Sequence, residues 1–206
     1  MNRTTLGLAG LACAVVGAGV SMGAISTVVG MGTQIAPPAV ANFPTLTGPL
    51  VDAWDEQQNV TLPAAGVLVD MFVNGGSMTS GAPTAGVVTG VVDSHFLHLT
   101  SGPLPFVSGT VTFSGAILGV IYSDLWLDLS DTYGAFGTVY PTTVPLRGMN
   151  TTGFLSAAGN TLQFQFQAQT GAIEIEQVRV LTRAVPAPGG VCLGALGMLA
   201  GMRRRR

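Results

Sequence analysis

Hydrophobic and polar residues alternate along the clearest segments of this chain, with the two-residue period of half-buried β-strands. In residues 161–168, Leu162, Phe164 and Phe166 fall on one face, and glutamines fill the positions between them. Residues 109–114 repeat the pattern, with valine and phenylalanine on one face and threonine on the other. Because successive side chains of a strand point to opposite faces, both segments are predicted to be strands with one buried face.

Longer apolar segments between turn signals predict further strands. Residues 66–73 form a buried-strand pattern that ends at the Asn-Gly-Gly turn of residues 74–76, and residues 84–99 form a long strand-rich stretch. In residues 173–180 the apolar phase slips by one position. This slip predicts a β-bulge or a change of sheet near Glu176.

The three leucines of residues 125–130 alternate with Trp126 and polar residues, which predicts another strand with the tryptophan on its outer face. No helical period of useful length occurs between residues 27 and 184. Short strands with turn signals about every ten residues favour an all-β fold. We therefore expect a single β-sandwich domain of jelly-roll-like topology at residues 51–184, preceded by an extended lead-in at residues 27–50.

The N-terminal segment is typical of a secretory signal peptide. Arg3 precedes an apolar run at residues 6–20, and residues 24–26 (Ala-Ile-Ser) fit a small-x-small cleavage site. The prediction is a signal peptide at residues 1–26. An uncleaved N-terminal membrane helix is the alternative, and a lipoprotein anchored at Cys13 fits less well because the apolar run before it is short.

The C-terminal segment, residues 185–206, has three parts. Pro186 and Pro188 interrupt regular structure, residues 191–202 carry no charge, and four arginines close the chain at 203–206. As a helix the apolar run covers about 18 Å, which is short against a hydrocarbon core of about 30 Å. The arginines would hold this end on the cytoplasmic side. The alternative is an ordinary buried helix followed by a basic tail.

This C-terminal segment resembles the PEP-CTERM sorting signal of bacterial surface proteins that are processed by exosortase. The family pattern is Val-Pro-Glu-Pro, a short apolar helix and an arginine-rich end, and Ala187 stands here in place of the glutamate. The sorting motif would be Val185, Pro186, Ala187 and Pro188, and the membrane anchor would include Val191, Leu193, Leu196, Leu199, Arg203, Arg204, Arg205 and Arg206.

The resemblance implies an exported precursor tethered to the inner membrane by a short C-terminal helix, with an exosortase-type enzyme as partner. The product would reach the cell surface or extracellular matrix and serve exopolysaccharide or biofilm. The middle of the chain is also similar, more loosely, to all-β domains found upstream of such signals. That similarity runs from Trp54 to Val180 and brings no activity with it.

Charge and cysteine usage narrow the function classes. Between residues 27 and 184 three arginines stand against ten acidic residues, a net charge of −7, so nucleic acid is excluded as a partner. Both cysteines, Cys13 and Cys192, lie in the terminal segments, which leaves the domain without a disulfide or a thiol nucleophile. Its polar surface must consist mainly of Thr, Ser, Gln and Asn, as in extracellular β-domains.

Two acidic groups are candidate calcium sites. Asp124, Asp128 and Asp131 lie close together in sequence, and carboxylate oxygens at the edge of a strand are ligands that Ca²⁺ prefers. The alternative is a solvated polar edge that limits sheet-to-sheet association. The second group consists of Asp52, Asp55 and Glu56.

Trp126 is the candidate glycan contact, because an exposed indole on a sandwich face can stack on a sugar ring. The alternative is that Trp126 packs under the segment at residues 131–147. We therefore hold open a carbohydrate-binding module, with or without calcium, beside the leading prediction of a non-catalytic structural or adhesive surface protein that needs no cofactor.

Catalytic patterns are weak. Asp93 and His95 share a strand face, but no Gly-x-Ser-x-Gly motif supplies a nucleophile, and His98 points to the other face. Glu174 and Glu176 share a face, yet neighbouring positions do not place two carboxylates across a substrate. A secreted hydrolase is therefore the least favoured alternative.

Overall fold

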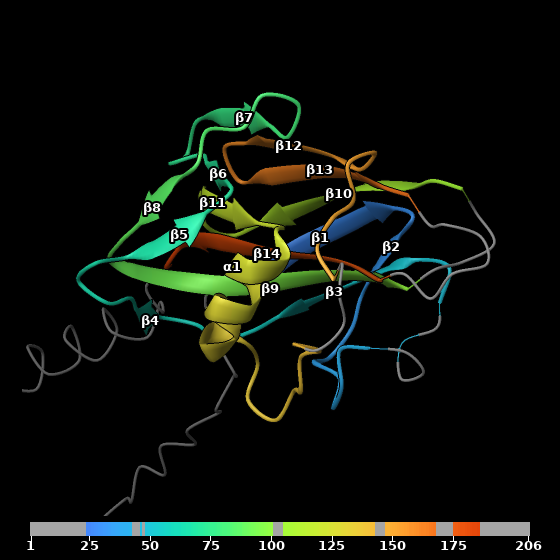
Figure 1. Ribbon diagram of the computed structural model, residues 1–206, viewed down its shortest axis with the longest axis horizontal. Coiled ribbons are helices and arrows are strands. Elements are labelled where there is room, and N and C mark those ends of the chain that lie inside the picture. Colours follow the sequence, from blue (N-terminus) through green and yellow to red (C-terminus); the bar gives the residue numbers. More distant parts are fainter. Residues whose placement is uncertain are drawn as a thin grey trace, which may run out of the picture.

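The structure is a computed structural model whose described part is all-β, with two main sheets and one short α-helix (Figure 1). The described helices include none with the length and hydrophobicity needed to cross a bilayer. Most of the predicted signal peptide and the sorting signal beyond Val185 lie outside the described residues. The structure describes residues 24–42, 46, 48–100, 105–142, 147–167 and 175–185.

Sheet A contains five antiparallel strands and confirms the two clearest alternating patterns as β10 and β13. The inward side chains of β10 and β13 are buried, and their polar neighbours face outward. In order across the sheet, the strands are β1 (Ile25–Gly30), β10 (Val107–Phe113), β13 (Thr161–Phe166), β12 (Phe154–Ala158) and β7 (Ser77–Thr79).

Sheet B contains seven strands, and its longest pair, β9 and β14, forms the centre. A parallel pair, β2 with β3, forms one margin, and β4 pairs with β9 beside it. The main order is β2 (Gly32–Gln34), β3 (Val51–Asp55), β9 (Val91–Thr100), β14 (Ile175–Arg183), β11 (Ile117–Ile121) and β6 (Met71–Phe72), with β4 at Val60–Thr61.

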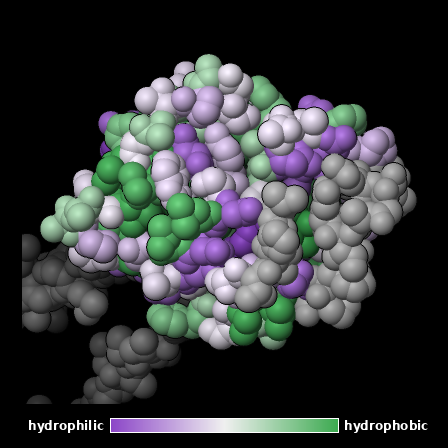
Figure 2. Space-filling model, viewed as in Figure 1, coloured by the Kyte–Doolittle hydropathy of each residue, from purple (hydrophilic) through white to green (hydrophobic). Residues whose placement is uncertain are grey.

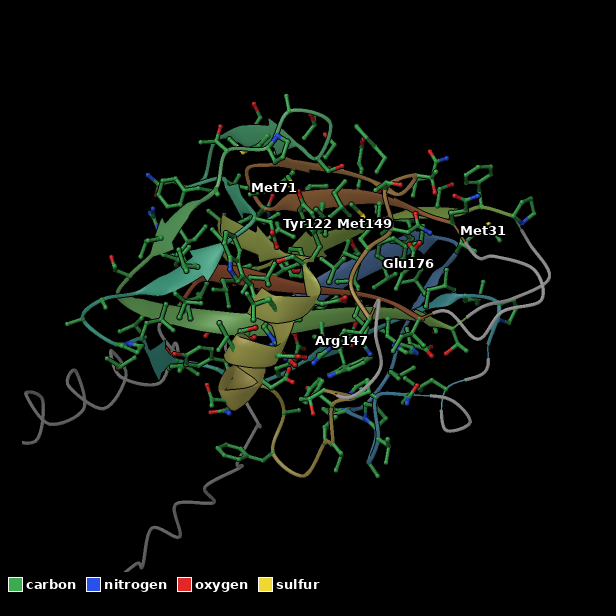
Figure 3. The ribbon with its side chains drawn as sticks, viewed as in Figure 1. Met31, Met71, Tyr122, Arg147, Met149 and Glu176 are labelled. Atoms are coloured by element: carbon green, nitrogen blue, oxygen red, sulfur yellow. The ribbon has the colours of Figure 1, made fainter. Side chains whose placement is uncertain are left out.

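The two sheets pack face to face around a common hydrophobic core, which is the arrangement of a β-sandwich. Residues of β10 and β13 meet residues of β9 and β14 there, and Phe164 and Leu97 are among the buried side chains. Met71 is fully buried in this core, while Met31, Tyr122 and Met149 are partly buried against it (Figure 3).

A second hydrophobic core lies on the other face of sheet B. Trp54, Phe96 and Leu181 of sheet B pack there against Leu127 and Tyr140. Because β9 and β14 are therefore covered on both faces, nearly all of their residues are buried, polar ones included. The segments that cover this face are α1 (Asp124–Ser130), the 3₁₀ helix η1 (Asp131–Tyr133) and the residues that follow.

A two-stranded sheet of β5 (Val67–Val69) and β8 (Gly86–Val88) packs beside β11. Gly119 of β11 makes the close approach possible, since a Cβ there would lie 2.7 Å from the Cγ1 of Val69. The apolar stretch predicted as one strand at residues 66–73 is therefore divided between β5 and β6.

The structure corrects the prediction for residues 125–130, which form α1 rather than a strand. In a helix, Leu125 and Leu129 share one face and Leu127 points elsewhere. Leu127 is fully buried, whereas Leu125 and Leu129 are 64% and 66% exposed. The alternating leucines reflect a single apolar contact with sheet B and two exposed side chains.

The segment expected as an extended lead-in supplies β1 and β2. Ile25 and Ser26, assigned from the sequence to the signal peptide, already belong to β1, and Ile25 pairs with Phe113 of β10. A register shift between Ile25 and Thr27 puts Ile25 and Val28 on the same inner face. The folded domain therefore begins earlier than residue 51.

The apolar phase slip near Glu176 has a different cause from the predicted bulge. β14 pairs with β9 in continuous register from Ile175 to Arg183, so no residue is inserted there. Both faces of β14 are buried, and apolar residues are free to occupy either face. The register shift of β14 lies instead on its β11 side, between Ile117 and Gly119.

The two ends of the described domain lie at the same end of the sandwich. The backbone N–H of Ser114 donates to the Ala24 carbonyl at 3.0 Å, and that of Arg183 donates to the Ala116 carbonyl at 2.8 Å. Both contacts involve the turn between β10 and β11. The predicted signal peptide and the predicted sorting signal would therefore leave the domain close together.

Candidate functional site

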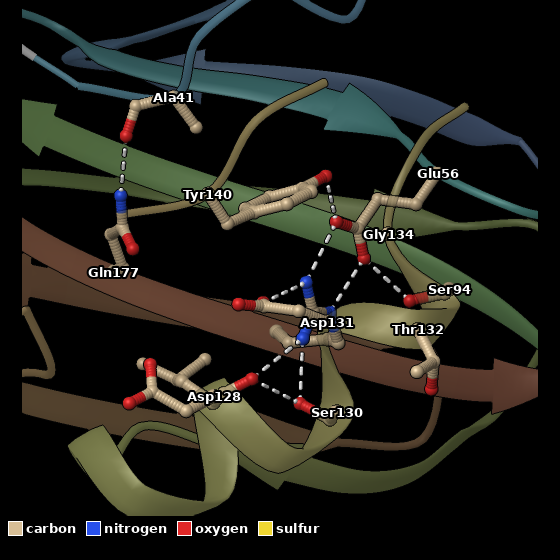
Figure 4. Close-up of polar contacts among 12 residues, drawn as sticks. Ala41, Glu56, Ser94, Asp128, Ser130, Asp131, Thr132, Gly134, Tyr140 and Gln177 are labelled. Carbon is tan, nitrogen blue, oxygen red and sulfur yellow. Dashed lines mark hydrogen bonds and ion pairs between the residues drawn. The ribbon is translucent and has the colours of Figure 1, made fainter. Parts of the chain in front are cut away.

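Arg179 of β14 is the centre of a buried ionic cluster on the outer face of sheet B (Figure 4). Its Nε and Nη2 donate to the two carboxylate oxygens of Glu56 at 2.7 and 3.1 Å. Nη1 donates to Ser130 Oγ at 2.6 Å and to the Leu127 carbonyl at 3.2 Å, and Nη2 also donates to Asp131 at 3.1 Å. All five guanidinium N–H groups thus have an acceptor.

The charges of this pair are compensated inside the protein rather than by water. The side chains of Arg179 and Glu56 are both fully buried. Burial alone would lower the pKa of Arg179, but the carboxylates of Glu56 and Asp131 outweigh it and raise that pKa above its ordinary value. The guanidinium also lies over the Phe96 ring, 5.0 Å from its centroid.

Arg147 extends the cluster toward the surface. Its Nη1 donates to Asp128 at 2.6 Å and to Asp131 at 2.8 Å, and its Nη2 donates to the other oxygen of Asp131 at 3.1 Å. Asp131 therefore bridges Arg147 and Arg179. We call Glu56, Asp128, Asp131, Arg147 and Arg179 the ionic cluster; it holds three carboxylates against two guanidinium groups.

A chain of hydrogen bonds continues from Arg147 Nε to the uncharged Gln177, whose Oε1 accepts at 2.8 Å. Thr100 donates its hydroxyl proton to the Leu46 carbonyl, so it accepts from His98 Nε2 at 2.8 Å. His98 Nδ1 is then the acceptor for the Gln177 amide at 3.0 Å. These partners fix His98 as the neutral Nε2–H tautomer.

The electrostatics of His98 agree with that assignment. Burial, and then the nearby positive charge of Arg147, lower the pKa of His98 to about 3. The imidazole is therefore uncharged at neutral pH.

Tyr140 joins the irregular segment after η1 to the cluster. Its hydroxyl donates to Glu56 and accepts from the backbone N–H of Ala135 at 3.0 Å. Burial, followed by the charge of Glu56, raises the pKa of Tyr140 above its ordinary value. Gly134 is necessary for this packing, because a Cβ there would lie 2.3 Å from the Tyr140 ring.

The arrangement fastens α1, η1 and the described residues Tyr140 and Arg147 onto sheet B. The groups that form these contacts come from β14 and from α1, η1 and the residues that follow them, and Glu56 follows β3 directly. The described hydrogen-bond partners of the two guanidinium groups come from separate segments of the protein itself, so the geometry is that of a structural clamp. No sequence pattern joined Glu56 to Arg179, which are 123 residues apart.

The predicted calcium ligands have other partners. Asp128 and Asp131 pair with Arg147, and Asp124 Oδ1 accepts the backbone N–H of Gly148. Among the described residues no group of three or more His, Cys, Asp or Glu side chains is arranged to hold a metal ion. The positive charge beside Asp128 and Asp131 is thus that of Arg147, and calcium binding at this group stays a prediction.

The second acidic group is also dispersed. Asp55 lies 2.7 Å from His95 Nδ1 and accepts the Ile25 backbone N–H, while Glu56 belongs to the ionic cluster. Asp52 is half-buried, and that burial raises its pKa. These three carboxylates therefore do not converge on one cation position.

The structure confirms that His95 and His98 face opposite sides of β9. His95 packs on Phe113 in the core between the sheets, with ring centroids 4.7 Å apart, whereas His98 lies on the side of Trp54. Asp93 accepts the backbone N–H groups of Asn59 and Val185. Asp93 and His95 thus share a face, but His95 contacts Asp55 rather than Asp93.

Trp126 is partly buried and lines a pocket of ≈ 210 Å³. The pocket lies between α1 and β5, and Tyr133, Leu68 and Leu129 also line it. Figure 2 shows hydrophobic side chains gathered over these two elements. The indole is therefore not the isolated exposed ring that a strand would have presented.

A second, more open groove of ≈ 510 Å³ lies on the outer face of sheet A. Val29 and Phe154, 58% and 41% exposed, contribute its apolar side chains, and Gln163 and Gln165 contribute amides. These two amides make no hydrogen bond to another described residue. Their alternation with core residues was predicted, but the groove they line was not.

The remaining predicted site residues have limited or no description. Glu176 is buried, and Glu174 lies outside the described residues. Val185 is the single residue of the sorting motif that the structure describes; the rest of the motif and the whole membrane anchor lie outside. The chain matches no protein-family model, no curated protein and no solved structure.

Proposed function

We propose that this chain is an exported, non-catalytic surface or matrix protein whose sandwich adheres to uncharged polysaccharide through the outer face of sheet A. The observation that carries the proposal is the composition of that face. The five described strands of sheet A contain no charged residue. Ser, Thr and Gln side chains occupy the outward positions beside Val29 and Phe154.

Such a face suits a neutral, hydroxyl-rich polymer. Amide and hydroxyl groups exchange hydrogen bonds with sugar hydroxyls without the desolvation cost of burying a charge. Phe154 provides an exposed ring for stacking against the apolar face of a sugar. The open groove allows a long chain to lie along it, and the acidic character of the domain disfavours polyanions.

The sorting part of the proposal rests on the sequence of the two ends. The tail carries the order and spacing of a PEP-CTERM signal, with Ala187 in place of glutamate. An exosortase-type enzyme would process the tethered precursor. The domain ends lie together at the β10–β11 turn, which is compatible with both hydrophobic segments entering one membrane. We also assign the sandwich to the jelly-roll class, because β9, β10 and β11 alternate between the sheets.

The test measures retention of the protein by uncharged and by acidic polysaccharides. We expect binding to at least one of dextran, mannan or β-glucan, and none to alginate. Replacing Gln163 and Gln165 together by alanine should weaken binding by roughly tenfold, or about 1.4 kcal/mol. Phe154→Ala should weaken it further. Flat signals for all neutral polymers would refute the adhesive role.

The second candidate is a carbohydrate-binding module that uses the Trp126 pocket. The pairing of Trp126 with Tyr133 in one cavity favours it. The same binding assay distinguishes the two faces, because Trp126→Ala should leave binding unchanged if sheet A is the contact surface. Loss of binding in Trp126→Ala with full binding in the Gln163/Gln165 variant would favour the pocket instead.

A further inference from the structure

Ile25 is built into the folded domain as firmly as any core residue. Its side chain is 4% exposed and belongs to the core between the sheets. Its backbone N–H donates to Asp55 Oδ1 at 2.8 Å, and that same oxygen lies 2.7 Å from Nδ1 of the fully buried His95. Removing Ile25 would leave both a gap in the core and a carboxylate without one of its donors.

The residue before Ile25 is also fixed. The Ala24 carbonyl accepts hydrogen bonds from the backbone N–H of Ser114 at 3.0 Å and from its hydroxyl at 2.9 Å. A mature chain that begins at Thr27, as the small-x-small match at residues 24–26 suggests, would lose all of these contacts. The folded domain therefore needs residues 24–26.

We infer that the signal peptide is cleaved between Gly23 and Ala24, so that the mature chain starts at Ala24. Ser21 and Gly23 provide the small residues that the peptidase requires three positions and one position before the bond. This is the last such site before Ile25, and it follows the apolar run by three residues. Hydrolysis adds one water across the bond, leaving a carboxylate on Gly23 and an amino group on Ala24.

The inference rests on the export that the proposed function assumes, and the experiment separates the two. The full-length chain is produced in an exporting bacterium, and the N-terminus of the recovered protein is sequenced. A start at Ala24 supports the inference. A start at Thr27, or at any other processed position, overturns it and leaves export standing. A membrane-bound chain that keeps Met1 refutes the inference alone, and a chain that keeps Met1 and is recovered from the cytoplasm refutes export and the inference together.

Two matched substitutions sharpen the result. Gly23→Leu puts a bulky side chain directly before the bond and should reduce the processed product at least tenfold. Ser26→Leu alters an exposed position and should leave both the yield and the Ala24 start unchanged. The reverse pattern, with processing blocked by Ser26→Leu and not by Gly23→Leu, would place the cleavage after Ser26.

Discussion

Replacing Glu56 by glutamine removes one charge from the buried centre of the ionic cluster while keeping the shape of the side chain. The carboxylate accepts two hydrogen bonds from Arg179, one from Ser94 and one from Tyr140. A glutamine amide would direct its own N–H groups at some of these donors. Arg179 would then keep its buried charge with Asp131 as its remaining carboxylate partner.

The expected cost follows from the burial of both partners. Breaking a buried ion pair by removing one member costs about 3–5 kcal/mol. For a chain of this size that lowers the melting temperature by about 6–20 °C. Unfolding in urea, followed by the fluorescence of Trp54 and Trp126, measures the loss directly.

Asp128→Asn is the matched control, because Asp128 also pairs with an arginine but its side chain is 34% exposed. Arg147 keeps both of its bonds to Asp131 in that variant. The loss should be about 0–1 kcal/mol. Equal losses in the two variants, or a loss below about 1 kcal/mol for Glu56→Gln, would refute the view that the buried pair holds the covering segment.

Combining Glu56→Gln with Arg179→Met tests the coupling. Once the arginine is removed, no unpaired buried charge remains, so the double variant should be more stable than the sum of the two single losses predicts. Strict additivity would show that the two side chains stabilise the fold independently.

Two further perturbations test other parts of the structure. His98→Gln should flatten the pH dependence of stability between about pH 4 and about pH 6.5. The pKa of His98 is about 3 in the folded protein and about 6.5 in the unfolded chain, so the unfolded chain binds the proton first as pH falls. The wild-type protein therefore loses stability as pH falls through this window. Denaturation midpoints from about pH 4 to about pH 7 check this, and parallel profiles for the two proteins would contradict it. Gly119→Ala should cost about 1–3 kcal/mol in urea unfolding, since its Cβ would meet Val69, whereas Gly81→Ala, with its nearest contact at 4.0 Å, should change stability by less than about 0.5 kcal/mol. Similar losses at the two glycines would mean that close packing at β11 is not the cause.

Strands with one solvent face were predictable because the two-residue period needs no knowledge of neighbours. β13 shows this, as its phenylalanines and glutamines divide between core and solvent. Strands covered on both faces were harder to interpret. In β14 the buried side chains include Gln177 and Arg179, so the apolar phase slip looked like a bulge although the register with β9 is continuous.

The short helix α1 was mistaken for a strand because three leucines at alternate positions satisfy the two-residue period as well as a helix does. Seven residues are too few for the helical period to show itself. The exposed fractions of the three leucines distinguish the helix from a strand, because only Leu127 is buried. The same strand prediction placed Trp126 on an exposed sheet face, whereas its side chain is partly buried and lines a pocket.

The ionic cluster was not predictable from spacing, because its members come from distant parts of the chain. One signal was available in the composition. Residues 27–184 contain three arginines and no lysine beside ten acidic residues. Two of these arginines, Arg147 and Arg179, are buried. Scarce charges in a polar, weakly charged domain are good candidates for interior ion pairs.

The strand order of sheet B also constrains how this molecule reaches its folded state. β14 is the last of the described strands along the chain, yet it lies between β9 and β11 and pairs with both. During synthesis, which starts at the N-terminus, β9 and β11 are made first. The position between them stays empty until β14 has been synthesised. Cooperative closure of sheet B therefore waits until β14 has been synthesised.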